Sequence, residues 1–209
     1  MTVIRGVATP REKTLRKLVR ALEALVAEGE DFTALPVERI LERAEVARST
    51  FYAHFESKSA LLRAVGGDVV TQVLDANQRW SELPDSAGRD ELREALRHLL
   101  ETYRAHGALL AAMSEAAAYD ADVRREFSRI LTVGQPALTA HVRRGQGAGS
   151  VRSDVDPVTT VTWLVWMIER CLYTQVRQAS NRELAKHVEA VTHIVWHSLY
   201  EGAPTRSSR

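Results

Sequence analysis

Hydrophobic residues recur along most of the chain at intervals of three and four positions, which is the period of an amphipathic α-helix. The first such stripe ends at Gly29, and a second lies between Val37 and Ala44. No long segment alternates between apolar and polar residues as a half-buried strand does. The pattern therefore predicts an all-α fold, in which an N-terminal three-helix bundle precedes a larger helical unit.

The segment from Val37 to Lys58 predicts two short helices joined by a tight turn. Pro36 suits the start of the first helix, where its missing N–H costs nothing. Phe51 and Phe55 are four residues apart, so both should point inward from one face of the second helix. This is the layout of a helix-turn-helix, whose second helix enters the major groove of DNA by its N-terminal residues.

The polar side chains of the second helix are the kinds of group that bind DNA. An arginine can reach base edges or a phosphate, and we assign this role to Arg48. Hydroxyl, imidazole and ammonium groups mainly position a helix on phosphates. The predicted DNA-binding residues are Arg48, Ser49, Thr50, Tyr52, His54 and Lys58.

This segment resembles the TetR family of bacterial one-component regulators. Thr50-Phe51-Tyr52-Ala53-His54-Phe55 followed by Lys58 is similar to the recognition-helix signature of that family, and Ala44-Glu45-Val46 is similar to its turn. Glu45 departs from the usual Gly of the turn, and Ala47 departs from the usual Ser or Thr that caps the next helix. The resemblance implies a homodimer that binds an operator in double-stranded DNA.

Charge and composition limit the other function classes. A formal net charge of +1 over 209 residues argues against a nonspecific polybasic coat for nucleic acid. Basic residues nevertheless crowd the N-terminus, where they indicate either a solvated helix face or, as we favour, an arm and helix near phosphates. They are Arg5, Arg11, Lys13, Arg16, Lys17 and Arg20.

Cys171 is the only cysteine, so one chain cannot form an internal disulfide or a thiolate metal site. No signal peptide is evident, and no apolar run reaches the about 18 residues of a membrane-spanning helix. We expect a cytoplasmic protein with no membrane partner, no metal and no cofactor. An all-helical enzyme is the alternative class, but no nucleophile–base pair or acidic dyad has supporting spacing.

The chain divides into a helix-turn-helix DNA-binding domain (1–56), a helical ligand-binding and dimerisation domain (57–203) and a disordered tail (204–209). Ser57 is expected to cap a long helix that ends before Pro84. Within that helix, Gly66-Gly67 indicates either close packing or a softened joint, because glycine is unfavourable in helix interiors.

Three further breaks are expected in the second half of the chain. Gly134-Gln135-Pro136 should kink a helix that begins near Asp120, because proline removes a helical hydrogen bond. The Gly-rich segment 145–153 should form a flexible loop. Asp156-Pro157 should start a long helix, and Asn181 should cap the last one.

The helix after Pro157 is apolar on more than one side, which predicts burial on more than one side. We therefore predict a dimer through residues of roughly 157–200, with Val188 and Val191 on its seam. Leu164–Leu172 and His193–Tyr200 also resemble the branch of the TetR family represented by the mycobacterial ethionamide-resistance repressor. That resemblance implies pairing of the last two helices with their copies in a second subunit.

The same resemblance implies a narrow lipophilic ligand tunnel in the second unit. Ile168 stands where that relative has an asparagine that hydrogen-bonds its ligands, so selectivity should depend on shape and length. An aromatic or Met stripe is also typical of plain core, and that alternative remains open. The predicted ligand-binding residues are Tyr103, Leu99, Met113, Phe127, Trp166 and Ile168.

Two polar pairs allow more than one interpretation. His193 and His197 have the spacing of two metal ligands, but interface or surface positions are favoured. Glu169-Arg170 interrupts an apolar run and is interpreted as structural ion pairing, with a polar anchor for a ligand as the alternative. The sequence thus predicts a repressor released by a small lipophilic effector. The alternative is a TetR-like DNA-binding protein that has no small-molecule ligand.

Overall fold

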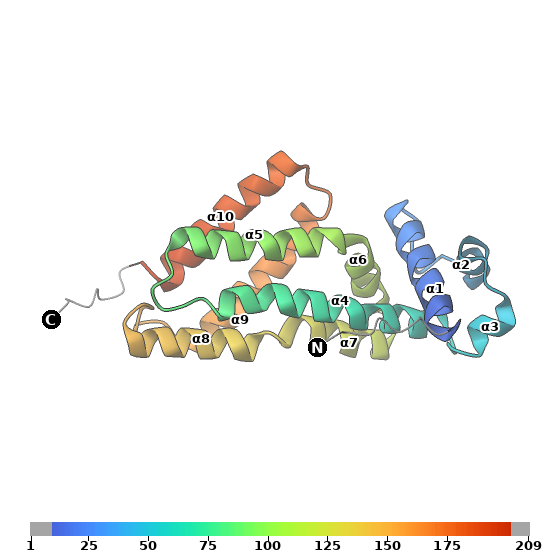
Figure 1. Cartoon of the computed structure of the whole chain (residues 1–209), viewed down its shortest axis with the longest axis horizontal. Coiled ribbons are helices and arrows are strands. Elements are labelled where there is room, and N and C mark those ends of the chain that lie inside the picture. The colour runs from blue at the N-terminus through green and yellow to red at the C-terminus, as the bar shows by residue number, and fades with distance from the viewer. Residues whose placement is uncertain (1–9, 202–209) are drawn as a thin grey trace, which may run out of the picture. The chain divides into compact units, whose positions relative to one another are not determined.

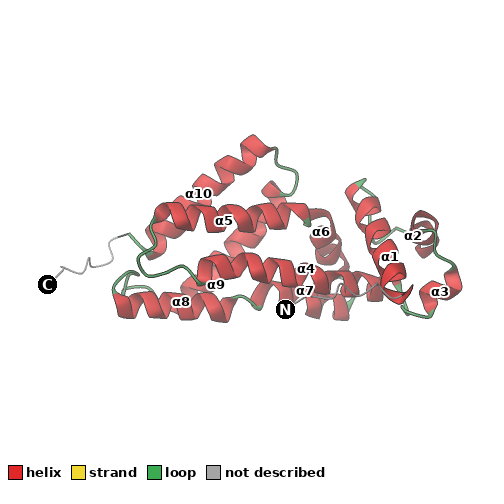
Figure 2. Cartoon of the chain, viewed as in Figure 1, coloured by secondary structure: helices red, strands yellow, loops and turns green. Residues whose placement is uncertain are grey.

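The computed structural model describes residues 10–201, and within them it contains helices and no strand (Figure 2). The prediction of an all-α fold is confirmed. The chain forms two compact units: one comprises residues up to Gly67 together with Ala108–Glu126, and the other comprises Asp68–Gly107 and the residues from Phe127 onward. The boundaries expected after residues 56 and 203 stay predictions.

The first unit begins with a bundle of three helices: α1 (Pro10–Ala27), α2 (Val37–Ala44) and α3 (Arg48–Tyr52) (Figure 1). Its core consists of the apolar side chains that recur at helical spacing in the sequence. Those with no exposed surface include Leu18, Leu22, Leu25, Ile40 and Phe51. The first part of α4 (Lys58–Ser81), most of α6 (Gly107–Ala116) and the start of α7 (Ala121–Thr132) complete this unit.

Glu45 closes α2 in a left-handed conformation, with φ 53° and ψ 49°. It is the one non-glycine residue with positive φ among those the structure describes. The N–H of Val46 donates to the carbonyl oxygen of Leu41 (3.1 Å), which ends the helix and starts the tight turn. The family's usual glycine would adopt this conformation without a steric cost.

Helix α4 begins as expected, because the N–H of Ala60 donates to the hydroxyl of Ser57 (3.1 Å). The two glycines inside it differ in their surroundings. A Cβ on Gly66 would lie 2.6 Å from the terminal methyl of Met113, whereas a Cβ on Gly67 would meet nothing within 4 Å. Close packing between α4 and α6 therefore accounts for Gly66.

The second unit is built from long helices that bury one another's apolar faces. Helix α5 packs on α10, and α8 packs on α9. A π-helical turn, η1, follows α9 directly and contacts α5. Besides the later parts of α4 and α7, the unit contains α5 (Arg89–Ala105), α8 (Gln135–Ala148), α9 (Pro157–Cys171), η1 (Leu172–Val176) and α10 (Asn181–Leu199).

Three sequence expectations for this unit are corrected. The Gly134 region separates α7 from α8 completely, since Gln135 and Pro136 form the first turn of a new helix. Residues 145–148 continue α8, which ends at the left-handed Gly149 (φ 78°). Gly145 leaves room for the Val151 side chain, which packs where a Cβ of Gly145 would lie. Ser180, not Asn181, caps α10 by accepting from the N–H of Glu183 (3.3 Å).

Two expectations hold. The Asp156 carboxylate caps α9 by accepting from the N–H of Thr159 (2.8 Å). Helix α4 ends at Ser81, before Pro84. Among the residues described, no helix combines the length and apolarity that crossing a bilayer requires. The expected tail, 204–209, lies outside the described residues.

Candidate functional site

The short helix α3 presents a polar surface around one buried anchor. Phe51 has no exposed surface, and its ring packs against Tyr52 (5.2 Å between centroids) and Phe55 (5.6 Å). This anchor fixes the helix while leaving its other sides open. Arg48, Ser49 and Tyr52 are exposed, and Thr50 and His54 are half-buried.

Arg48 is held in a defined position although its side chain is exposed. Its guanidinium donates to the Glu38 carboxylate on α2 (2.5 Å) and lies over the Tyr52 ring, 5.4 Å from the centroid. The carboxylate orients the arginine and also competes with any phosphate or base for it. Ala47 precedes the helix without a side-chain cap, as the sequence indicated.

Lys58 is the exception among the predicted DNA-binding residues. Its ammonium donates to the carbonyl oxygens of Phe32 (2.8 Å), Thr33 (2.7 Å) and Leu35 (2.9 Å). A lysine has three N–H donors, so all of them are used inside the protein. In this structure Lys58 closes the loop between α1 and α2, and its assignment to a phosphate stays a prediction with this structural role as the alternative.

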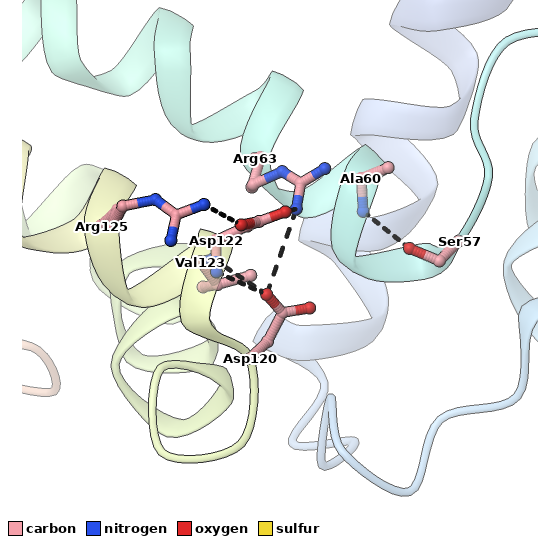
Figure 3. Close-up of polar contacts among 7 residues, drawn as sticks. All are labelled: Ser57, Ala60, Arg63, Asp120, Asp122, Val123 and Arg125. Carbon is pink, nitrogen blue, oxygen red and sulfur yellow. Dashed lines mark hydrogen bonds and ion pairs between the residues drawn. The ribbon is translucent and has the colours of Figure 1, made fainter.

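Charged groups join the N-terminal parts of α4 and α7 (Figure 3). Arg63 lies 2.8 Å from Asp122 and 4.0 Å from Asp120, and Arg125 also pairs with Asp122. Asp120 accepts from the N–H of Val123 (3.1 Å), which lowers the pKa of that carboxyl. The start of α4, immediately after the recognition segment, is thus tied to the start of α7.

The basic residues near the N-terminus are described only in part. Arg5 lies outside the described residues, and the side chain of Arg11 is not described. The remaining four lie on α1 and are exposed, which is compatible with both interpretations of this cluster; they are Lys13, Arg16, Lys17 and Arg20.

The second unit contains a cavity of about 50 Å³. Its wall is mostly aliphatic, and three of the predicted ligand-binding residues, Leu99, Tyr103 and Ile168, are part of it. The remaining lining residues come from α4, α7, α8, α9 and η1: Val73, Asn77, Trp80, Ile130, Leu131, Gly134, Gln135, Leu138, Val165, Glu169 and Leu172.

The other three predicted ligand-binding residues lie elsewhere. Met113 is fully buried in the first unit against Gly66. Trp166 is 45% exposed, on the outer side of α9. Phe127, on α7, is half-buried but does not reach the cavity wall. The period of a helix indicates that such residues share a face, but it does not say which neighbour that face meets.

Sequence reasoning missed two polar members of the wall, Asn77 and Gln135, and ranked Glu169 as an ion-pair partner. Arg170 instead lies over the Tyr173 ring (5.6 Å), and no ion pair joins Glu169 to another described residue. Burial raises the pKa of the Glu169 carboxyl, and Arg170 opposes that shift. A polar residue inside an otherwise apolar helical face was the only available signal.

Next to the cavity lies a partly buried polar network. The Trp80 indole N–H donates to the Tyr200 hydroxyl (3.0 Å), which also contacts Nε2 of His141 (2.8 Å). Arg144 approaches Nδ1 of His141 (2.9 Å). Because a guanidinium can only donate, Nδ1 accepts and the neutral ring carries its proton on Nε2. Burial raises the pKa of Tyr200 to about 12 and, with Arg144, lowers the pKa of His141.

An apolar groove lies along the outer side of α9 and the neighbouring part of α10. Trp163 is 74% exposed and Ile194 is 41% exposed. The groove is lined by Thr159, Thr160, Trp163, Leu164, Trp166, Met167, Ile194 and Ser198. Val188, predicted to lie on a dimer seam, is only 1% exposed and belongs to the core of its own subunit. Nearby, Glu189 pairs with Arg93 (3.0 Å) and His197 pairs with Glu201 (2.8 Å).

Comparison with known proteins agrees with both units. Residues 18–65 match the model for bacterial regulatory proteins of the tetR family, and residues 92–201 match that for the C-terminal domain of the transcriptional regulator EthR. The second match alone covers more than half of the 209 residues.

Individual relatives extend this agreement. The transcriptional repressor DhaR of Mycobacterium sp. (strain GP1) is 30% identical over 139 residues, covering 64% of this chain and 68% of DhaR. The regulator EthR of Mycobacterium tuberculosis is 26% identical over 201 residues, covering 94% of this chain and 92% of EthR.

Among solved structures, the regulator FadR of Bacillus subtilis in complex with stearoyl-CoA superposes with a TM-score of 0.71 at 15% identity, over 88% of this chain and 98% of FadR. This similarity concerns the fold. The family consists of transcriptional regulators, which sets aside the alternative of an all-helical enzyme. The chain belongs to the TetR family of DNA-binding transcriptional regulators and has a C-terminal domain of the EthR type.

Proposed function

We propose that this regulator is a cytoplasmic homodimeric repressor that leaves its operator when a small, mostly apolar effector binds the second unit. The observation that carries the proposal is the mostly aliphatic cavity bounded by α4, α5, α7, α8, α9 and η1. Clefts between the helices of a bundle are common ligand sites. FadR, solved with stearoyl-CoA, shows that a protein of this fold can hold a long apolar chain.

The size of the cavity indicates how an effector would act. Ligand pockets usually measure roughly 300–1,000 Å³, whereas this cavity measures about 50 Å³. A ligand of more than a few atoms must therefore move the surrounding helices apart. Helix α4 contributes Val73, Asn77 and Trp80 to the wall, and its first turn directly follows the recognition segment. A ligand that binds the expanded cavity more tightly would shift the population away from the DNA-competent state.

DNA contact is proposed for the exposed side of α3, with Arg48 directed to base edges or a nearby phosphate. Ser49, Thr50, Tyr52 and His54 position the helix. Lys58 is left out of this set, since its ammonium is already bound to three carbonyl oxygens.

A dimer through the outer side of α9 is supported by the apolar groove that contains Trp163 and Trp166. Two recognition helices in a dimer reach half-sites about 34 Å apart. Replacing Trp163 by Glu should give a folded monomer that binds the operator poorly. Tyr119→Glu is the matched control, because Tyr119 is 81% exposed and lies far from the groove in sequence. A Trp163→Glu protein that remains dimeric by light scattering contradicts this interface.

The test of the function is a footprint of the purified protein on the DNA upstream of its own coding sequence, followed by fluorescence-anisotropy titration of the protected site. Arg48→Ala should weaken binding by at least about tenfold, the effect of losing one good base or charge-assisted contact. Arg89→Ala, an exposed arginine on α5, should leave binding unchanged. A lipophilic compound that raises the melting temperature should also release the DNA. Stabilisation without release leaves a DNA-binding protein that this ligand does not regulate.

A further inference from the structure

The cavity contains polar groups that the protein itself leaves unused. Besides Trp80, four of its lining side chains can form hydrogen bonds: Asn77 on α4, Tyr103 on α5, Gln135 on α8 and Glu169 on α9. None of them forms a hydrogen bond with another residue in the described part of the chain. The amide nitrogen of Gln135 is buried and has no partner there. A buried donor without an acceptor typically costs about 1–3 kcal/mol, so this arrangement favours a bound acceptor.

The polar network next to the cavity is hydrogen-bonded, in contrast to the polar groups that face the cavity. Trp80 also lines the cavity, but its indole N–H points away and donates to Tyr200 (3.0 Å). His141 and Arg144 are likewise hydrogen-bonded (2.9 Å between Nη2 and Nδ1). The polar groups of this network are therefore paired within the protein, whereas those that face the cavity are not. Elsewhere in the described part of this unit, Nε of Arg93 is also buried without a partner.

The charge of the wall restricts the ligand further. Glu169 is half-buried at the cavity, and its closest basic neighbour in sequence, Arg170, is exposed and lies over Tyr173. No lysine, arginine or histidine is part of the described cavity wall. A carboxylate or phosphate placed there would meet a like charge with no cation to compensate it.

We infer that the effector of the proposed regulator has an uncharged polar head that accepts a hydrogen bond from Gln135 and donates one to Glu169, and that anionic lipids such as free fatty acids are rejected. A primary amide or an alcohol has both functions, and the rest of the molecule is apolar. This inference rests on the proposed effector function. It also revises the expectation from Ile168, because the polar anchors are Gln135 on α8 and Glu169, the residue that follows Ile168 on α9.

The test uses octanamide and octanoate, which have the same chain length and nearly the same shape and differ in charge. Isothermal titration of the full-length dimer at neutral pH should give at least about tenfold tighter binding of octanamide, the equivalent of one hydrogen bond together with the avoided repulsion. Equal affinity for the two compounds, or tighter binding of octanoate, overturns the inference while leaving the effector function intact.

Two variants assign the effect to the cavity groups. Gln135→Leu should weaken octanamide about tenfold and raise the melting temperature of the unliganded protein, because it removes the orphaned donor. Glu169→Gln should strengthen octanoate by about tenfold and so reduce the discrimination. The controls are Gln178→Leu and Glu101→Gln, both at exposed positions outside the cavity wall.

The possible failures are distinguishable. If neither compound binds and neither raises the melting temperature, the proposed effector function and the inference both fail. If octanamide binds but the Gln135→Leu and Glu169→Gln proteins behave as the wild type, the ligand lies elsewhere and the assignment of the polar head is overturned.

Discussion

The recognition surface on α3 and the cavity of the second unit both expose polar side chains that lack protein partners, but for opposite reasons. On α3, Ser49 and Tyr52 are exposed, so their hydroxyl groups are accessible to solvent, and we propose that they contact DNA. In the cavity, the amide nitrogen of Gln135 is buried, so its missing hydrogen bond is destabilising, and we propose that a ligand supplies it. An exposed polar group needs no partner besides solvent, whereas a buried polar group without a partner costs free energy, so the two regions give evidence of different strength for a ligand.

Lys58 gives the most sensitive test of this comparison. It lies at the edge of the recognition surface, yet its ammonium is hydrogen-bonded within the protein like a buried group. Lys58→Ala should lower the free energy of unfolding by about 2–3 kcal/mol, as three carbonyl oxygens lose a charged donor. Urea denaturation measures this effect, with Lys17→Ala on the exposed side of α1 as the control.

The competing interpretation of Lys58 makes a different prediction. If Lys58 bound a phosphate, the alanine variant would retain its stability, and the slope of operator affinity against salt would fall by about one unit. A stable Lys58→Ala protein with this flatter slope restores the original assignment to DNA.

His141 tests the same comparison with a buried side chain that is hydrogen-bonded within the protein. Its folded-state pKa is lowered below the ordinary value of 6.5 by burial and by Arg144, with Asp85 opposing the shift. The unfolded chain therefore takes up a proton before the folded protein does, and stability should be complete above pH 6.5 and fall as the pH decreases below it. The free energy of unfolding can change by up to about 1.4 kcal/mol per pH unit in this range.

The pH effect is measured by denaturation between about pH 5 and 7, above the range in which ordinary carboxylates titrate. His141→Gln should be less stable at neutral pH, because the hydrogen bonds to Tyr200 and Arg144 are disturbed, but its stability should depend less on pH. An unchanged acid slope in this variant assigns the pH dependence to another group.

Glu45 offers the smallest expected effect and concerns the turn that orients the recognition surface. Glu45→Gly should stabilise the protein by about 0.5 kcal/mol, since glycine adopts the left-handed conformation without strain but gains entropy in the unfolded state. Thermal denaturation detects the change. Glu56→Gly, at an exposed position without positive φ, should not be stabilising. Loss of stability in Glu45→Gly shows that the Glu45 side chain has a role beyond the turn.

The sequence by itself determined the helices and the recognition segment, because both depend on residues close together in the chain. Ser57 and Asp156 cap their helices by hydrogen bonds to groups three residues later, so a short stretch of sequence is enough to predict them. Phe51 and its polar neighbours similarly lie within a single short segment. Such interactions follow from helical period and local hydrogen bonding, which do not require knowledge of distant residues.

Only the tertiary structure decided which residues meet across the chain. Asn77 and Glu169 are ordinary polar residues in sequence, and they become members of one wall only when α4 and α9 pack in the same unit. Trp166 shows the converse, since its aromatic character predicted a pocket while its position on the outer side of α9 leaves it exposed. The helical period of apolar residues predicts that a helix has an apolar face. The packing of helices that are distant in sequence decides whether this face lies in the core, at a cavity or in solvent.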